Sequence, residues 1–113
     1  VVREVAREAL LLRQYLDARV EQKVTVEEMA ASIYRSKDYA IKLFKREFGQ
    51  TPYSYLIRKK MDVAKSLLRN TTIPVKQIAF RLGYDDQHYF SNLFKKETGA
   101  SPVQFRKSRE GHD

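Results

Sequence analysis

Few side chains in this 113-residue sequence are suited to catalysis or to metal binding. There is no cysteine, which excludes a thiolate nucleophile, a disulfide and a thiolate metal site. With only two histidines, His88 and His112, a histidine zinc site is implausible and a Ser-His-Asp triad cannot be assembled. The sequence also has no GxxxxGK(S/T) loop to hold a nucleotide phosphate. It therefore predicts no enzyme, no cofactor and no metal ion.

Side chains that bind polyanions are abundant. The chain has 22 Lys and Arg against 14 Asp and Glu, a net charge of +8. Residues 1–30 have a net charge of −1, whereas residues 31–113 have a net charge of +9. An excess of this kind favours nucleic acid as a partner, although a well-solvated protein surface can have the same composition.

One predicted helix carries polar side chains of the kind that read base edges. Between Asp86 and Lys95 there is no charged residue. The outward positions of this helix are Gln87, His88, Ser91 and Asn92. Amide side chains pair well with adenine in the major groove. The alternative is a surface helix without a role, but a solvated helix normally carries more charge.

The elements that must position these residues are all helical. Apolar residues recur at three- and four-residue steps, and no segment shows the two-residue alternation of a strand. The all-α chain is expected to have about seven helices, over Val2–Glu21, Val26–Ile33, Lys37–Phe48, Pro52–Arg69, Val75–Leu82, residues 86–98 and a short stretch from Pro102. Their aromatic residues Tyr39, Phe44, Tyr89 and Phe94 are assigned to the core. The tail from Lys107 to Asp113 is expected to be polar and loose.

Local signals mark where these helices begin. Thr25 and Glu28 have the spacing of a capping box, and Ser36 is a candidate N-cap. Either Asp85 or Asp86 is expected to cap the helix that follows.

The sequence repeats itself. Residues 39–49 and 89–99 are identical at six of eleven positions, at an offset of 50, and Val26–Ile33 matches Val75–Leu82 at an offset of 49. The repeated unit is a short helix, a tight turn and a longer helix, which is the helix-turn-helix plan. A plain helical bundle remains the alternative, but the duplicated spacing together with the uneven charge favours DNA binding.

The repeat suggests a division of the chain. We predict a first helix-turn-helix subdomain with its N-terminal helix over residues 1–51, a linker helix over 52–70, and a second subdomain with a polar tail over 71–113. The first residue is Val rather than Met, so we expect a fragment or a processed chain.

Both halves of the sequence resemble one family, the AraC/XylS-type DNA-binding domains. The first half matches at Ala30, Ser36, Leu43-Phe44-Lys45-Arg46, Gly49-Gln50-Thr51-Pro52 and Tyr55. The second half matches at Ile78-Ala79, Leu82-Gly83-Tyr84, Tyr89-Phe90-Ser91-Asn92-Leu93-Phe94-Lys95-Lys96, Gly99, Ser101-Pro102 and Phe105-Arg106. The resemblance covers about residues 5 to 107.

The resemblance implies a bacterial transcription regulator, often an activator, that binds double-stranded DNA. Its two recognition helices, about residues 36–48 and 86–98, would read successive major-groove segments. RNA polymerase is an expected partner, as is a sensing or receiver domain outside this chain. The charged lead-in helix and the turn over residues 32–36 resemble the AraC-type ends of response regulators.

The resemblance also implies base contacts from the first recognition helix, at Asp38, Ile41 and Lys42, beside those expected from the second. Lys42 can donate to guanine O6 or N7, and Ile41 can only meet a thymine methyl group or the sugar edge. Asp38 can accept from cytosine N4, or it can simply be a favourable acid in the first turn of a helix. Lys42 and Asn92 stand where relatives commonly have arginine, so the preferred DNA sequence cannot be transferred.

Phosphate contacts are expected from helix starts and basic flanks. The candidates are Ser36, Lys37, Lys45, Arg46, Thr51, Thr72, Lys95, Lys96 and Ser101. Arg58, Lys59 and Lys60 form a basic band on the linker helix, for which a DNA role and a solvated face are both open.

Other functions remain as alternatives. A non-specific nucleic-acid-binding module would lack sequence preference, and a helical protein-interaction module would expose an apolar groove. A binder of single-stranded RNA would expose its aromatic residues, which here follow core spacing. The longest uncharged stretch, residues 48–57, is too short to span a membrane, and no signal peptide is evident. We therefore expect a cytoplasmic protein without a membrane partner.

Overall fold

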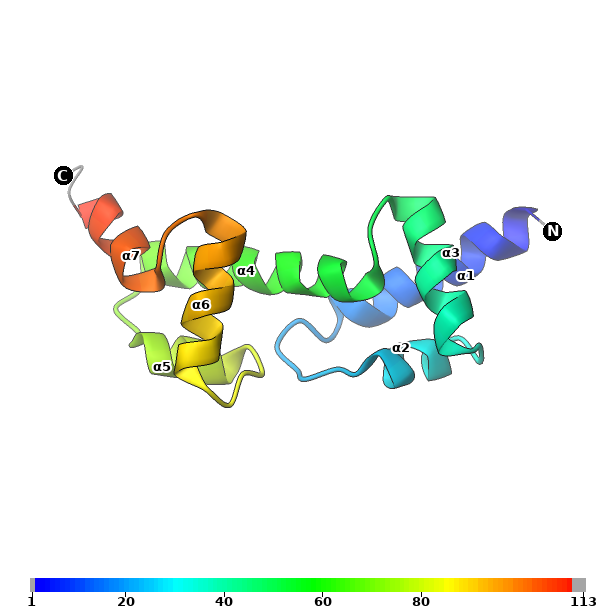
Figure 1. Cartoon of the computed structure of the whole chain (residues 1–113), viewed down its shortest axis with the longest axis horizontal. Coiled ribbons are helices and arrows are strands. Elements are labelled where there is room, and N and C mark those ends of the chain that lie inside the picture. Colours follow the sequence, from blue (N-terminus) through cyan, green and yellow to red (C-terminus); the bar gives the residue numbers. More distant parts are fainter. Residues whose placement is uncertain (1, 111–113) are drawn as a thin grey trace. The chain divides into compact units, whose positions relative to one another are not determined.

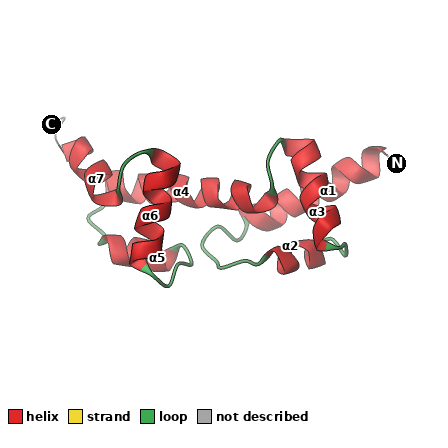
Figure 2. Cartoon of the chain, viewed as in Figure 1, coloured by secondary structure: helices red, strands yellow, loops and turns green. Residues whose placement is uncertain are grey.

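The computed structural model describes the backbone of residues 2–110 and the side chains of residues 5–108. Seven helices and no strands make up this part of the chain, which confirms the all-α class (Figures 1 and 2). The helices are α1 Val2–Asp17, α2 Val26–Ser32, α3 Lys37–Phe48, α4 Pro52–Asn70, α5 Val75–Arg81, α6 Gln87–Thr98 and α7 Pro102–Glu110. His112 lies outside the described residues.

The chain forms two compact units. Unit 1 comprises Val1–Val20 and Val24–Ile57, and unit 2 comprises Glu21–Lys23 and Arg58–Asp113. Helix α4 is continuous, so its first residues belong to unit 1 and the remainder to unit 2. Each unit therefore contains one pair of a short and a longer helix joined by a turn, α2–α3 or α5–α6 (Figure 1).

The helix ends follow the local signals in the sequence. The Glu28 amide donates to Thr25 Oγ1 at 3.1 Å and the Thr25 amide donates to Glu28 Oε1 at 2.9 Å, which completes the predicted capping box. Ser36 caps α3, and Asp86 rather than Asp85 caps α6. Gly49 ends α3 with a φ of +77°, a left-handed conformation that glycine adopts without a steric penalty.

The core of unit 1 forms around Phe44, which is completely buried. The Phe44 ring lies 4.7 Å from that of Phe48 and 5.3 Å from that of Tyr55, measured between centroids. The other buried members are Ala9, Leu12, Leu16, Val24, Met29, Ala30, Ile33, Ala40, Leu43 and Leu56. These residues come from all four helical segments of unit 1, so their burial positions α3 against α1 and α2.

Unit 2 has its own buried residues. Phe90 and Phe94 of α6 are completely buried, with ring centroids 6.0 Å apart, and Phe105 of α7 meets Phe94 edge-on at 5.5 Å. The remaining buried apolar side chains among the described residues of this unit are Met61, Ala64, Leu68, Ile78, Ala79, Leu82 and Pro102. They hold α5 and α6 in place, so the outward face of α6 is set by the same packing.

Two predictions about where helices end were wrong in detail. Helix α1 ends at Asp17 and not at Glu21. Beyond Asp17 the Arg19 amide donates to the Leu16 carbonyl, three residues back, at 2.9 Å, so the four-residue hydrogen-bond spacing of the α-helix is lost there. Helix α7 continues to Glu110 through the stretch that was expected to be loose from Lys107 on. Its lysine, arginine and glutamate residues are good helix formers, although they give no apolar periodicity.

Tyr89 was wrongly assigned to the core. Its side chain is 53% exposed, whereas Phe90 beside it is completely buried. Neighbouring residues of a helix point about 100° apart, so Tyr89 lies at the edge of the apolar stripe rather than in it. Tyr39, its counterpart in the first copy, is partly buried.

Candidate nucleic-acid interface

The first helix-turn-helix consists of α2, a short turn and α3. In the turn the Arg35 amide bonds to the Ala30 carbonyl at 3.1 Å, and Tyr34 has a φ of 58° with its side chain 95% exposed. Burial of Ala40, Leu43 and Phe44 fixes the inward face of α3. The other faces of α3 carry the predicted contact residues Lys37, Asp38, Lys42, Lys45 and Arg46, all exposed, and Ile41, which is half-buried; the acid Glu47 is exposed beside them.

The second helix-turn-helix has the same plan. The turn after α5 contains Gly83, with a φ of +91°, and leads to Asp86, whose carboxylate accepts the His88 amide at 2.8 Å. Of the predicted base-reading residues, Gln87, His88 and Asn92 are exposed and Ser91 is half-buried. Each copy therefore displays a helix of the same length whose predicted contact residues lie together on the surface.

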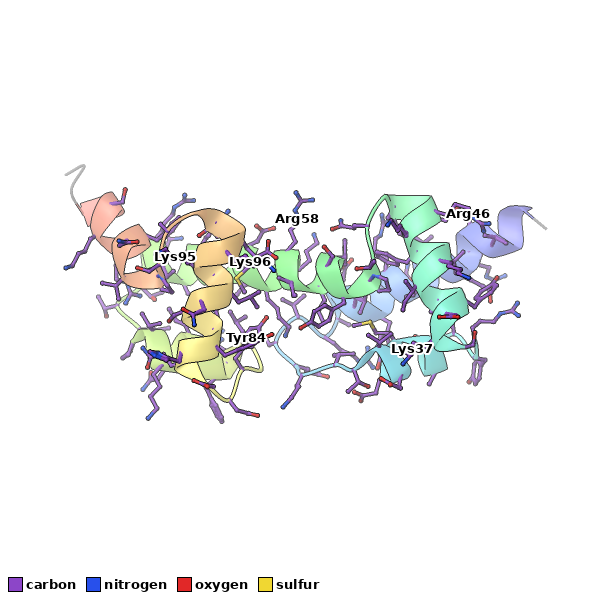
Figure 3. The ribbon with its side chains drawn as sticks, in the orientation of Figure 1. Lys37, Arg46, Arg58, Tyr84, Lys95 and Lys96 are labelled. Atoms are coloured by element: carbon purple, nitrogen blue, oxygen red, sulfur yellow. The ribbon has the colours of Figure 1, made fainter. Side chains whose placement is uncertain are left out.

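Seven of the nine predicted phosphate-contacting residues fall into two groups. Basic residues stand in the last turn of each longer helix, Lys45 and Arg46 in α3 and Lys95 and Lys96 in α6. Figure 3 labels Arg46, Lys95 and Lys96. The hydroxyl oxygens of three candidates accept hydrogen bonds from backbone amides. Ser36 accepts from the Tyr39 amide, Thr51 from the Ser54 amide, and Ser101 from the Gln104 amide.

Those three hydroxyl groups keep a hydrogen that can be donated to a phosphate oxygen. Thr72 is exposed ahead of α5, whose N-cap residue is Pro74. Lys37 has an acidic neighbour, because its Nζ lies 3.5 Å from the carboxylate of Glu27.

A contact that the sequence did not reveal positions the start of α3. Glu8 of α1 accepts hydrogen bonds from Tyr39 Oη and from Arg35 Nε, both at 2.7 Å, and the Arg35 guanidinium lies 4.6 Å from the Tyr39 ring centroid. The hydrogen bond from Arg35, followed by that from Tyr39, lowers the pKa of Glu8 below its usual value of 4.5. These partners are 27 and 31 residues away in sequence, so no local pattern could have identified them.

We expect Glu8→Gln to destabilise the protein at neutral pH and to flatten its acid dependence. A carboxyl group with a lowered folded-state pKa contributes stability above its unfolded pKa and loses that contribution as the pH falls through the folded value. The Arg35 side chain is 49% exposed and solvent screens the pair, so the loss at pH 7 should be at most about 1 kcal/mol.

Urea unfolding of both proteins between pH 7 and pH 3 measures this effect. Glu27→Gln on α2, where the carboxylate is 72% exposed, is the matched control and should change the free energy of unfolding less. Wild-type and Glu8→Gln curves that superimpose over the whole pH range would mean that the Glu8 contacts contribute nothing.

The basic band on α4 does not form one surface. Arg58 is exposed, Lys59 is half-buried, and Lys60 is buried. Figure 3 shows Arg58 projecting from α4. Lys60 is thus removed from the candidates for direct phosphate contact.

Two negative findings apply to the described residues. They contain no cluster of three or more His, Cys, Asp or Glu side chains that could hold a metal ion. No helix among them is both long and apolar enough to cross a membrane.

Comparison with known proteins identifies the domain. The sequence model of a family described as a helix-turn-helix domain matches residues 29–108. The C-terminal domain of AraT, a response regulator from Geobacillus stearothermophilus, superposes with a TM-score of 0.87 and 38% identity, covering 90% of this chain and 85% of that chain. The DNA-binding domain of the global transcriptional factor AdpA, solved in complex with a target DNA, shares the fold with a TM-score of 0.83 and 24% identity, covering 93% of this chain and 94% of that chain.

Characterised regulators match at the level of sequence. The HTH-type transcriptional activator RhaS of Klebsiella pneumoniae is 35% identical over 99 residues, which are 88% of this chain and 36% of RhaS. The chain spans about a third of the length of the curated relatives it matches, between 31% and 39% for the first three. The predicted resemblance is confirmed: the chain belongs to the AraC family of transcription regulators, as a sequence-specific helix-turn-helix DNA-binding domain.

Proposed function

We propose that α3 and α6 enter successive major-groove segments of one DNA duplex. The observation that carries this proposal is the duplication: each copy ends in a twelve-residue helix, with its apolar face buried and its predicted contact residues displayed. A recognition helix in this plan contacts base edges with its N-terminal residues. The division into residues 1–51, 52–70 and 71–113 is proposed on the same basis.

The proposed base contacts come from both helices. In α3 they are Asp38, Ile41 and Lys42, and in α6 they are Gln87, His88, Ser91 and Asn92. The proposed phosphate contacts are Ser36, Lys37, Lys45, Arg46, Thr51, Thr72, Lys95, Lys96 and Ser101. Lysine and asparagine favour guanine and adenine respectively, so the two helices should prefer different bases.

The two units differ in net charge, which supports unequal electrostatic contributions of the units to DNA affinity. Unit 2 contains thirteen basic and seven acidic side chains, a net charge of +6, whereas unit 1 contains nine and seven, a net charge of +2. Attraction to phosphates grows with positive charge and does not depend on base sequence. Unit 2 should therefore supply more of the affinity for any DNA.

The full-length protein is proposed to act in the cytoplasm on bacterial transcription, with RNA polymerase as a partner. The likeness to the C-terminal domain of a response regulator supports a receiver domain preceding this one. A receiver or other sensing domain would make DNA binding responsive to a signal.

The replacements Lys42→Ala and Asn92→Ala test the base contacts. Each should reduce discrimination at particular base pairs by about 1–3 kcal/mol, because a base-specific hydrogen bond is removed while phosphate contacts remain. The measurement is affinity for a duplex selected from a random pool and for its single-base variants, at fixed salt. Equal losses on every duplex would reassign the residue to a phosphate contact, and a wild-type protein without preference would favour non-specific binding.

A further inference from the structure

A buried ammonium group lies inside unit 2. Lys60 of α4 is only 4% exposed, and its Nζ donates to the backbone carbonyl oxygens of Gln22 and Leu82, each at 2.6 Å. The ammonium also lies 5.7 Å from the centroid of the Tyr84 ring. Burial lowers the pKa of Lys60 to about 8, while the nearby Glu21 acts in the opposite direction, so the group is mostly charged at pH 7. A buried charge is unfavourable unless it is hydrogen-bonded, and the two carbonyl groups offset part of the lost hydration of the ammonium.

The two carbonyl groups belong to segments that meet at the second helix-turn-helix. Leu82 is the C-cap residue of α5, directly before the turn into α6. A positive charge at this point also interacts favourably with the C-terminal carbonyl groups of the helix. Gln22 belongs to the segment Glu21–Lys23, which is part of unit 2. One side chain therefore links this segment to the turn.

The backbone of the segment Glu21–Lys23 also lies very close to the backbone of the α5–α6 turn. Gly83 has a φ of +91°, and a Cβ atom at this position would lie 2.9 Å from the Gln22 carbonyl carbon and 2.9 Å from the Lys23 nitrogen. This distance is too short for a non-bonded contact of a Cβ atom. Only glycine, which has no Cβ atom, therefore allows the two backbones to approach this closely.

Two ion pairs add to the contact between the same segment and the same turn. Arg81 Nε donates to Glu21 Oε1 at 2.7 Å, and Lys23 Nζ donates to Asp85 Oδ2 at 3.1 Å. Both pairs are exposed and each is worth little alone. They nevertheless lie on either side of the Lys60 contact, and Asp85 directly precedes Asp86, the N-cap of α6.

We propose that Lys60 is a positioning residue for the second recognition helix: it fastens the segment Glu21–Lys23 to the α5–α6 turn and thereby sets the direction in which α6 meets DNA. Its burial prevents it from touching a base or a phosphate. The proposal rests on the proposed reading of DNA by α6.

Lys60→Met tests this role, because methionine keeps most of the side-chain volume and removes the ammonium. We expect protection of the base pairs read by α6 to be lost, with protection by α3 retained. Affinity for the selected duplex should fall about tenfold or more, because α6 no longer places its side chains against the base edges. The control Lys65→Met removes the same charge from a half-buried position of α4 and should keep both protected segments.

A second pair of variants tests the contact without changing Lys60. Gly83→Ala forces the segment away from the turn, and Gly99→Ala imposes a similar backbone strain, at a φ of +90°, where a Cβ atom would meet nothing within 4 Å. Protection by α6 should be lost in Gly83→Ala and kept in Gly99→Ala. If Lys60→Met does not fold, this pair decides the question.

The outcomes separate the two proposals. A folded Lys60→Met protein that keeps both protected segments, or that weakens both equally, would overturn the positioning role, as would equal footprints for the two glycine variants. Wild-type protein that gives only one protected segment would instead contradict the proposed reading of DNA by both helices.

Discussion

Phe94→Ala should lower the free energy of unfolding by about 3–5 kcal/mol, the usual effect of truncating a buried phenylalanine. The Phe94 side chain is completely buried and lies between the rings of Phe90 and Phe105, at 6.0 Å and 5.5 Å. Alanine would remove both ring contacts and leave a cavity where α6 meets α7. A domain of this size is stable by only about 5–15 kcal/mol, so the variant should be close to unfolded at 37 °C.

Urea unfolding followed by circular dichroism measures this loss. Tyr89→Ala on the same helix removes an aromatic ring that is half exposed, and it should change the free energy of unfolding by less than about 1 kcal/mol. Similar losses in the two variants would contradict the assignment of Phe94 to the core and of Tyr89 to the surface.

The double replacement Lys95→Glu with Lys96→Glu should weaken binding to every duplex by at least about a hundredfold at low salt. Both side chains are exposed in the last turn of α6, and reversing their charges replaces attraction to phosphates with repulsion. The slope of log affinity against log salt should become shallower by about two, because two phosphate contacts are lost. Base preference at fixed salt should be unchanged.

Two comparisons control this result. Lys107→Glu on α7 reverses an exposed charge outside the proposed contacts and should have a much smaller effect. Basic residues in a last turn also stabilise their own helix by up to about 1 kcal/mol, so unfolding of the double variant must be measured in parallel. An unchanged salt slope would show that these lysines do not neutralise phosphates.

Local signals explain how much of the fold was predictable. Thr25 with Glu28 and Ser36 mark helix starts, because caps depend on residues only a few positions apart. The duplication then identified the two helix-turn-helix copies and the helices expected to read DNA. The first conclusion follows from spacing within the sequence, and the second also needed the uneven charge and the resemblance to the AraC/XylS-type domains.

Contacts between distant residues explain what was missed. Lys60 looked like part of a basic surface, yet its partners Gln22 and Leu82 are 38 and 22 residues away. Glu8 likewise meets Tyr39 only after α1 and α3 have packed together. Side-chain burial and long-range hydrogen bonds arise from tertiary packing, which periodicity describes only as an average over a helix face.

The central claim is that both copies read DNA, and a protection footprint of the chain on its selected duplex tests it most directly. We predict two protected major-groove segments about 10 bp apart, and Lys42→Ala and Asn92→Ala should each weaken protection mainly in one of them. A single protected segment, insensitive to one of these replacements, would show that only one copy binds bases and that the other supports the fold.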